Sequence, residues 1–318
     1  MSAIESAIAR VLVRLHEEVR RTLSASTVDQ AQVLGKNPKG DRQRGFDVAA
    51  DMAARRFLEQ EFSAGIILSE ESDDHRFGDA ERRWCENPFS HPRLRESLSA
   101  NRRKGFLHES GRDRNLVPAG TQAAPVYRFI VDPVDGSDNW GRGLPLSSVA
   151  VAVLPAQGPI ALDRVVAALV GGLDEETPIV AARGEGAQRG AEKLQASGTR
   201  RIADALVSCQ LNHFAPTPQV SDVFARARAV RSYGCASQAI ALVAGGAIDA
   251  HLDIRSRLTP ESFLAAAAIL REAGGCVLDT HGNPLPEFAN IHQRTTIIAA
   301  ATEELAREII DALAGHNS

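Results

Sequence analysis

The chain has 318 residues, of which 44% are hydrophobic and 24% are charged. This balance is typical of a globular protein, and the length allows one large domain or two fused halves. A formal net charge of −4 argues against a general nucleic-acid-binding surface, and no apolar run approaches the length that a membrane span needs. We therefore expect neither a nucleic acid nor a membrane as a partner.

The cysteines and the start of the chain bear on its cellular compartment. The four cysteines are widely separated and form no Cys-x-x-Cys pair, so they indicate neither a disulfide framework nor a zinc site. Charged side chains interrupt the first 20 residues, unlike the apolar stretch of a secretion signal. We therefore expect a cytoplasmic protein with reduced thiols. The cysteines are Cys85, Cys209, Cys235 and Cys276.

Two helices are expected near the N-terminus. Apolar side chains recur at helical spacing from Ile4 to Val19, and a second amphipathic helix is predicted over residues 46–62. Asp41 and Asp47 flank the entry to the second helix. A carboxylate in the first turn interacts favourably with the helix dipole, so a purely structural role for Asp47 is one interpretation.

A short apolar strand is predicted at residues 65–69, followed directly by Glu70 and Glu71. Carboxylates at the carboxyl end of a strand lie where open α/β sheets place their chemistry. Ordinary surface charge is the alternative interpretation of two adjacent glutamates. Residues 72–125 then become polar, rich in arginine and interrupted by prolines. We interpret them as an insertion that can form a lid or a dimer contact, with arginines that either meet an acidic substrate or are solvated.

The most informative stretch covers residues 126–146, VYRFIVDPVDGSDNWGRGLPL. Its first part alternates like a β-strand and leads into Asp132 and Asp135. Gly136 frees the turn, and Ser137 or Asp138 is expected to cap a helical turn whose N–H groups favour an anion. Two carboxylates beside an anion site suit Mg²⁺, which completes its coordination with water and phosphate oxygens. A solvated turn is the alternative interpretation, because Asp, Pro and Gly are common turn residues.

The rest of the chain alternates strands and helices. Strands of an antiparallel sheet are predicted at 147–154, 164–170 and 177–182, and further strands at 205–208, 247–252 and 295–300. Helices are predicted at 238–244, within 258–275 and at 303–313. A division near residue 172 would separate two α/β halves that share one cleft.

The string DPVDGSDNW resembles the signature DP(I/L/V)DG(T/S)xN(F/W/Y) of the inositol monophosphatase superfamily, which includes fructose-1,6-bisphosphatase-like enzymes. The resemblance covers nearly the whole chain outside residues 72–125. It implies an α/β (α+β) fold, the layered αβαβα sandwich, with an N-terminal half at 1–172 and a C-terminal half at 173–318 that completes the cleft. It also implies two or three Mg²⁺ ions, lithium sensitivity and a homodimer.

The same resemblance implies roles for particular residues. In the superfamily helix that ends in Glu-Ala-Gly-Gly, a metal-binding aspartate stands where this chain has Ser262, so we expect the preceding Glu261 to supply the charge. A favourable charge at a helix N-terminus is the alternative for Glu261. The implied metal ligands are Glu70, Asp132, the carbonyl of Val134, Asp135 and Glu261. The implied catalytic residues are Asp47, Glu71 and Ser137. The implied substrate-binding residues are Gly136, Ser137, Gly234, Cys235, Ala236 and Asp253, of which Asp253 could equally be a plain strand-end aspartate.

These features predict an enzyme that hydrolyses a small phosphorylated substrate, a polyol or sugar phosphate of the inositol monophosphate or fructose bisphosphate kind. The nucleophile would be a water activated by Mg²⁺. Two alternatives remain open. One is a 3′-phosphonucleotide phosphatase of the same superfamily, and the other is a non-catalytic member that binds a phosphorylated ligand or a protein partner.

Overall fold

A computed structural model describes residues 3–25, 32–78 and 127–315. Most of the predicted insertion at residues 72–125 therefore lies outside the described residues, as does Cys85. No helix in the described part of the chain is long and apolar enough to cross a membrane.

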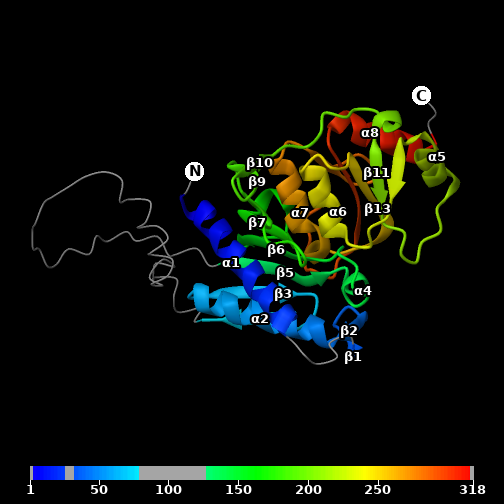
Figure 1. Ribbon diagram of the computed structural model, residues 1–318. Coiled ribbons are helices and arrows are strands. Elements are labelled where there is room, and N and C mark those ends of the chain that lie inside the picture. Colours follow the sequence, from blue (N-terminus) through cyan, green and yellow to red (C-terminus); the bar gives the residue numbers. More distant parts are fainter. Residues whose placement is uncertain (1–2, 26–31, 79–126, 316–318) are drawn as a thin grey trace, which may run out of the picture.

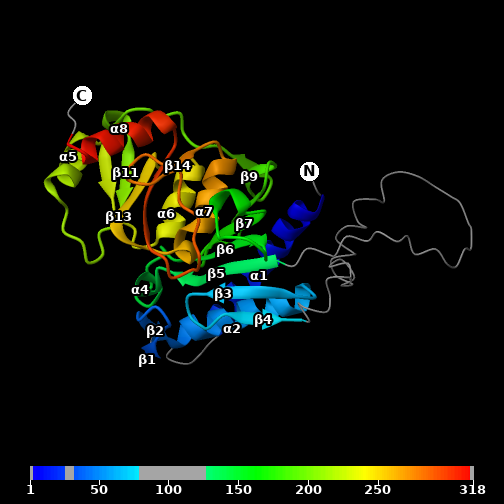
Figure 2. The same cartoon turned by 180° about the vertical axis from the view of Figure 1, so that it is seen from behind.

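Helices and two sheets alternate in five layers (Figure 1). Helices α1 (Ala3–Ala25) and α2 (Gly45–Glu61) cover one face of an eight-stranded sheet. Helices α6 (Ala236–Ala244) and α7 (Pro260–Glu272) lie between this sheet and a five-stranded one. Helices α5 (Pro218–Arg226) and α8 (Glu303–Leu313) pack together, and α8 covers the outer face of the second sheet. Figure 2 shows the same layers from behind. The predicted αβαβα sandwich is confirmed.

The strand order of both sheets is defined. The first sheet has the order β10-β9-β8-β7-β6-β5-β3-β4, and the second β12-β11-β13-β15-β14. The first comprises β3 (Gly65–Ser69), β4 (His75–Phe77), β5 (Tyr127–Asp135), β6 (Ser148–Pro155), β7 (Ala167–Gly172), β8 (Ile179–Ala182), β9 (Gly186–Arg189) and β10 (Glu192–Leu194). The second comprises β11 (Leu206–Cys209), β12 (Ala229–Arg231), β13 (Ala250–Leu258), β14 (Cys276–Leu278) and β15 (Thr295–Ala300). A separate hairpin pairs β1 (Val33–Lys36) with β2 (Arg42–Arg44).

The alternation of side chains along β6 explains why the first sheet is covered on both faces. Val149, Val151 and Val153 pack against α1 and α2. Ala150 and Ala152 instead join the core that contains α6 and α7. Successive strand residues point to opposite faces, so a strand apolar at every position is stable only when both faces are buried.

The turn after β5 differs in detail from the prediction. Gly136, not Ser137 or Asp138, is the N-cap of the short helix α4 (Ser137–Trp140), with φ at +83°. A side chain there would also bring its Cβ to 2.8 Å from the carbonyl oxygen of Leu146. Only glycine combines that backbone angle with so close an approach.

The other predicted elements are present with ends shifted by a few residues, and the strand expected at 247–252 begins at Ala250 and continues to Leu258. The division at residue 172 stays a prediction, and the first sheet continues beyond it to Leu194.

The pairing of β3 with β5 positions the carboxylates. The two strands run parallel, with Ser69 opposite Val131. Glu70 and Asp132 therefore leave the same edge of the sheet at the same level. The pairing of β5 with β6 is irregular between Asp132 and Asp135, which changes the direction of the chain at the second aspartate.

Candidate active site

A cavity of about 460 Å³ lies at this edge of the first sheet and extends toward the second sheet. Its wall is mostly polar and carries both acidic and basic side chains. The residues that line it are Asn37, Asp41, Arg42, Arg44, Glu70, Glu71, Asp132, Val134, Asp135, Gly136, Ser137, Asp138, Asn212, His213, Gly234, Arg255 and Ser262.

Asp132 lies at the centre of the acidic wall and is 2% exposed. Its Oδ1 accepts a hydrogen bond from the backbone N–H of Val134 at 3.2 Å, and its Oδ2 accepts one from the Ser262 hydroxyl at 3.4 Å. Burial, followed by repulsion from Glu70 and Asp135, raises the pKa of Asp132 well above its usual range. These surroundings therefore disfavour the ionised form of Asp132.

Asp135 is held by the start of α6. Its Oδ2 accepts hydrogen bonds from the backbone N–H of Ser237 at 2.7 Å and from the Ser237 hydroxyl at 2.6 Å. The thiol of Cys235 lies 3.2 Å from the same oxygen and is buried, so it contacts Asp135 from behind the cavity wall. Gly234 lines the cavity, whereas Cys235 and Ala236 are buried.

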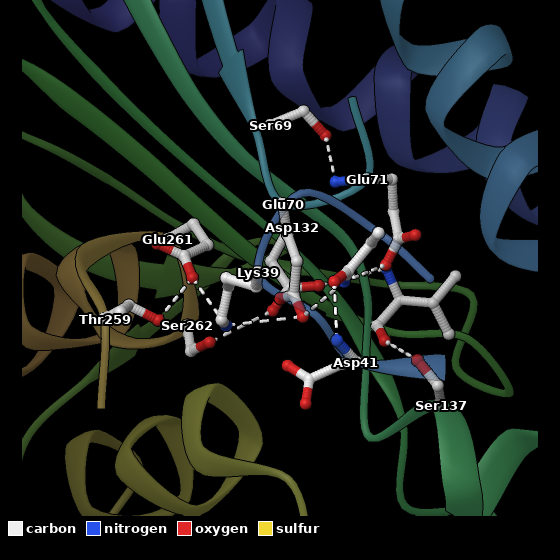
Figure 3. Close-up of polar contacts among 12 residues, drawn as sticks. Lys39, Asp41, Ser69, Glu70, Glu71, Asp132, Ser137, Thr259, Glu261 and Ser262 are labelled. Atoms are coloured by element: carbon white, nitrogen blue, oxygen red, sulfur yellow. Dashed lines mark hydrogen bonds and ion pairs between the residues drawn. The ribbon is translucent and has the colours of Figure 1, made fainter. Parts of the chain in front are cut away.

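Glu261 is buried at the N-terminus of α7 and contacts a lysine from the β1–β2 hairpin (Figure 3). The Nζ atom of Lys39 donates a hydrogen bond to Oε1 of Glu261 at 2.8 Å and lies 3.3 Å from Oε1 of Glu70. The Thr259 hydroxyl also donates to Oε1 of Glu261, while Oε2 has no hydrogen-bond partner among the described residues. Sequence reasoning did not single out Lys39.

Glu71 and Asp47 lie on the side of the cavity formed by the first sheet and α2. Glu71 accepts a hydrogen bond at Oε2 from Gln43, 2.9 Å away, and burial raises its pKa to about 7. Asp47 is fully buried in the first turn of α2, where its Oδ2 accepts from the N–H of Arg44 at 2.8 Å. Burial raises the pKa of Asp47 to about 6. The Ser137 hydroxyl donates to the carbonyl of Val134 at 2.9 Å.

Asp253 lies in β13 with 0% exposure and forms an ion pair with Arg255. Arg255 donates from Nε to Oδ1 at 2.9 Å and from a terminal nitrogen to Oδ2 at 2.6 Å. Arg255 lines the cavity, whereas Asp253 does not. Asp253 and Arg255 are two positions apart in the sequence, but only the structure shows that the arginine lines the cavity.

The sequence of residues 90–318 matches the model of the family described as "Inositol monophosphatase family". The chain belongs to the inositol monophosphatase family. It is 25% identical over 308 residues to a fructose-1,6-bisphosphatase/inositol-1-monophosphatase of Methanothermobacter thermautotrophicus, covering 95% of both chains. It is also 31% identical over 196 residues to inositol monophosphatase 2 of Rattus norvegicus, covering 58% of this chain and 62% of that one.

Solved structures have the same fold. The extragenic suppressor protein suhB of Bartonella henselae superposes with a TM-score of 0.68 at 22% identity, covering 98% of both chains. An inositol monophosphatase from Anabaena superposes with a TM-score of 0.66 at 17% identity, covering 98% of this chain and 96% of that one. Members of the inositol monophosphatase family are hydrolases of phosphoric monoesters, and this chain is one of them.

The family implies Mg²⁺, and the donor set of this cavity fits a hard cation. Glu70, Asp132 and Asp135 supply carboxylates to the cavity lining, and the buried carboxylate of Glu261 lies beside it, paired with Lys39. Several carboxylates with a single lysine among them leave negative charge that favours binding of a cation with oxygen ligands. Within residues 3–25, 32–78 and 127–315, however, no three His, Cys, Asp or Glu side chains converge tightly enough to form a ready-made metal site.

The structure thus sorts the predicted residues by their place. Eight of them line the cavity: Glu70, Glu71, Asp132, Val134, Asp135, Gly136, Ser137 and Gly234. Five are absent from its lining: Asp47, Cys235, Ala236, Asp253 and Glu261. The chemical roles assigned to both groups stay predictions.

Proposed function

We propose that this protein is a Mg²⁺-dependent phosphomonoesterase that hydrolyses a small polyol or sugar phosphate. One observation carries the proposal. The parallel pairing of β3 with β5 ends at Ser69 and Val131, and the residues that follow, Glu70, Glu71 and Asp132, line a single cavity. The lining also contains arginines, as an anionic substrate requires.

Four groups are suited to hold the cation: the carboxylates of Glu70, Asp132 and Asp135, and the carbonyl of Val134. They are hard oxygen donors on one cavity wall. When bound, Mg²⁺ supplies Lewis-acid chemistry, lowering the pKa of a water and stabilising charge on phosphate oxygens.

Glu71 is suited to accept the proton of the attacking water. Its pKa of about 7 is close to the physiological pH, which is the most effective range for a general base. Gln43 fixes the carboxylate by donating both to Oε2 and, at 2.7 Å, to the backbone carbonyl of Glu71. We assign to Ser137, beside the glycine turn, the role of orienting the water or the phosphate, and the N–H groups of Gly136 and Ser137 are candidate phosphate donors.

The arginines of the cavity lining favour a substrate with a second anionic group. Arg42, Arg44 and Arg255 all line the cavity. Arg255 is fixed by Asp253 and by the carbonyl of Asn212 at 3.0 Å, so its position is set before a substrate arrives. This feature favours a sugar bisphosphate over a monophosphate, and a 3′-phosphonucleotide is the alternative with the same charge.

The cytoplasmic location and the homodimer remain part of this proposal. Sedimentation of the purified protein measures the oligomer directly, and a sedimentation coefficient of a dimer is expected.

Phosphate release tests the proposal. Inositol 1-phosphate, fructose 1,6-bisphosphate and 3′-phosphoadenosine 5′-phosphate are compared with and without Mg²⁺. We expect Mg²⁺-dependent release that is fastest for fructose 1,6-bisphosphate and falls by about 10³-fold in Asp132→Asn, because the variant lacks a central carboxylate. Asp163→Asn, an exposed change outside the cavity lining, is the matched control. Full activity of a folded Asp132→Asn variant would contradict the proposed mechanism.

A further inference from the structure

The loop at the tip of the β1–β2 hairpin has a defined conformation beside the acidic wall. The N–H of Gly40 donates to the carbonyl of Asn37, and the N–H of Asn37 donates to the carbonyl of Asp41, each at 2.9 Å. The N–H of Asp41 in turn donates to Oδ1 of Asn37 at 2.9 Å. The side-chain amide of Asn37 then donates to Glu70 at 3.3 Å. These bonds fix the hairpin tip against the carboxylates.

This tip directs Lys39 into the acidic cluster. Its side chain is 15% exposed, and its ammonium group lies between a carboxylate from the end of β3 and one from the start of α7, as Figure 3 shows. Asp132 is also close enough to attract it. A surface lysine would normally keep its ammonium group in water. Here the ammonium group contacts Glu70 and Glu261 instead.

Lys39 remains charged in this position. Burial alone would lower its pKa, but attraction to Glu70 and Glu261 outweighs burial and raises the pKa. Its two ion pairs, at 2.8 Å to Glu261 and 3.3 Å to Glu70, place a positive charge inside the cluster.

We propose that Lys39 is a tethered cation that takes the place of one metal ion in this active site. Two features of α7 support the assignment. Ser262 brings a hydroxyl, not a carboxylate, to within 3.4 Å of Asp132, so this position offers no charged metal ligand. Glu261, one residue earlier, directs its Oε1 to the ammonium group. The carboxylate at the start of α7 thus pairs with the lysine, and the α7 side chain beside Asp132 is uncharged.

The consequence is a smaller number of bound divalent ions. An ammonium group carries one positive charge and has no open coordination position, so it offsets carboxylate repulsion but cannot activate a water. The remaining cation would bind on the side of Asp132 and Asp135. The inference rests on the proposed function only in taking the bound ion to be a divalent cation of a phosphatase site.

Binding of Mn²⁺, counted by electron paramagnetic resonance of the free ion, tests this without any substrate. We expect Lys39→Gln to bind about one more Mn²⁺ per chain than the wild type, because the removed ammonium group leaves carboxylate oxygens for a metal. Lys39→Arg, which keeps the charge, should bind as the wild type does. Lys36→Gln, an exposed change in the same hairpin, is the matched control and should also leave the count unchanged.

Equal Mn²⁺ counts for the wild type and a folded Lys39→Gln variant would overturn the proposal, because they would mean that the lysine leaves when metal binds. If Lys39→Gln does not fold, wild-type crystals soaked in Mn²⁺ give the answer. Anomalous scattering should place Mn²⁺ away from Lys39, with its Nζ still between Glu70 and Glu261; an ion between these two glutamates would refute the inference.

Phosphate release is recorded separately on the same samples. A higher Mn²⁺ count in Lys39→Gln with no release from any substrate would support the tethered cation and reject the proposed function. Phosphate release by the wild type, with equal Mn²⁺ counts in the wild type and Lys39→Gln, would support the proposed function and reject the tethered cation.

Discussion

Buried carboxylates occur on two sides of the cavity, and their surroundings differ. On the β13 side, Asp253 receives two hydrogen bonds from the side chain of Arg255 and a third from its backbone N–H at 3.1 Å. On the β3–β5 side, Asp132 is 2% exposed, and within the described residues it accepts hydrogen bonds only from the N–H of Val134 and the Ser262 hydroxyl. Asp253 thus has an arginine partner within the protein, whereas Asp132 has no arginine or lysine among its hydrogen-bond donors in the described residues and belongs to the proposed metal site. The raised pKa of Asp132 agrees with this assignment, because perturbed pKa values cluster at functional sites.

Substitution of Glu71, on the β3–β5 side, should produce the largest loss of turnover. We expect Glu71→Gln to lower turnover by about 10²–10⁴-fold, because an amide cannot accept the proton of water. Its thermal stability should be unchanged or higher, since the variant removes a buried charge but keeps an acceptor for Gln43. Steady-state kinetics and a melting curve measure both. Glu185→Gln, exposed at a turn, is the control, and a loss of activity below tenfold would remove Glu71 from the mechanism.

On the β13 side, substitution of Arg255 should produce the largest loss of stability. Arg255→Met leaves the fully buried Asp253 without its partner, so we expect the free energy of unfolding to fall by about 3–5 kcal/mol. Urea denaturation measures the change, and Arg307→Met, an exposed ion pair on α8, should change stability by less than about 1 kcal/mol. The double variant Asp253→Asn/Arg255→Met should recover part of the loss. No recovery would mean that Arg255 stabilises the protein through packing.

His251, in β13, should make a smaller and pH-dependent contribution to the free energy of unfolding. Burial lowers its pKa to about 4 in the folded protein, whereas an unfolded chain titrates near its ordinary value of 6.5. The fold therefore favours the neutral ring, and its contribution to stability is complete above pH 6.5 and is lost as the pH falls toward 4. The loss should reach about 3 kcal/mol, given about 1.4 kcal/mol for each pKa unit.

Urea denaturation at several pH values measures this dependence. The curve should flatten in His251→Gln and keep its slope in His281→Gln, where the histidine is exposed. An unchanged slope in His251→Gln would assign the acid sensitivity to the carboxylates.

The sequence by itself determined most helices and strands, and the resemblance carried by DPVDGSDNW implied the order of the layers and a candidate site. Strand β15 and helix α8 have the predicted bounds, because alternation and helical periodicity are local patterns that each layer must satisfy to be buried. DPVDGSDNW likewise revealed the central carboxylates, since its strand, turn and acidic residues are adjacent in the chain.

Only the tertiary structure decided which charges meet. Lys39 and Glu261 are 222 positions apart, and Cys235 contacts Asp135 across 100 positions. No periodicity connects such pairs, because their contacts arise when a hairpin and two helix N-termini pack around the edge of the first sheet. The sequence could therefore name the carboxylates of the site, but their partners depend on how distant segments pack.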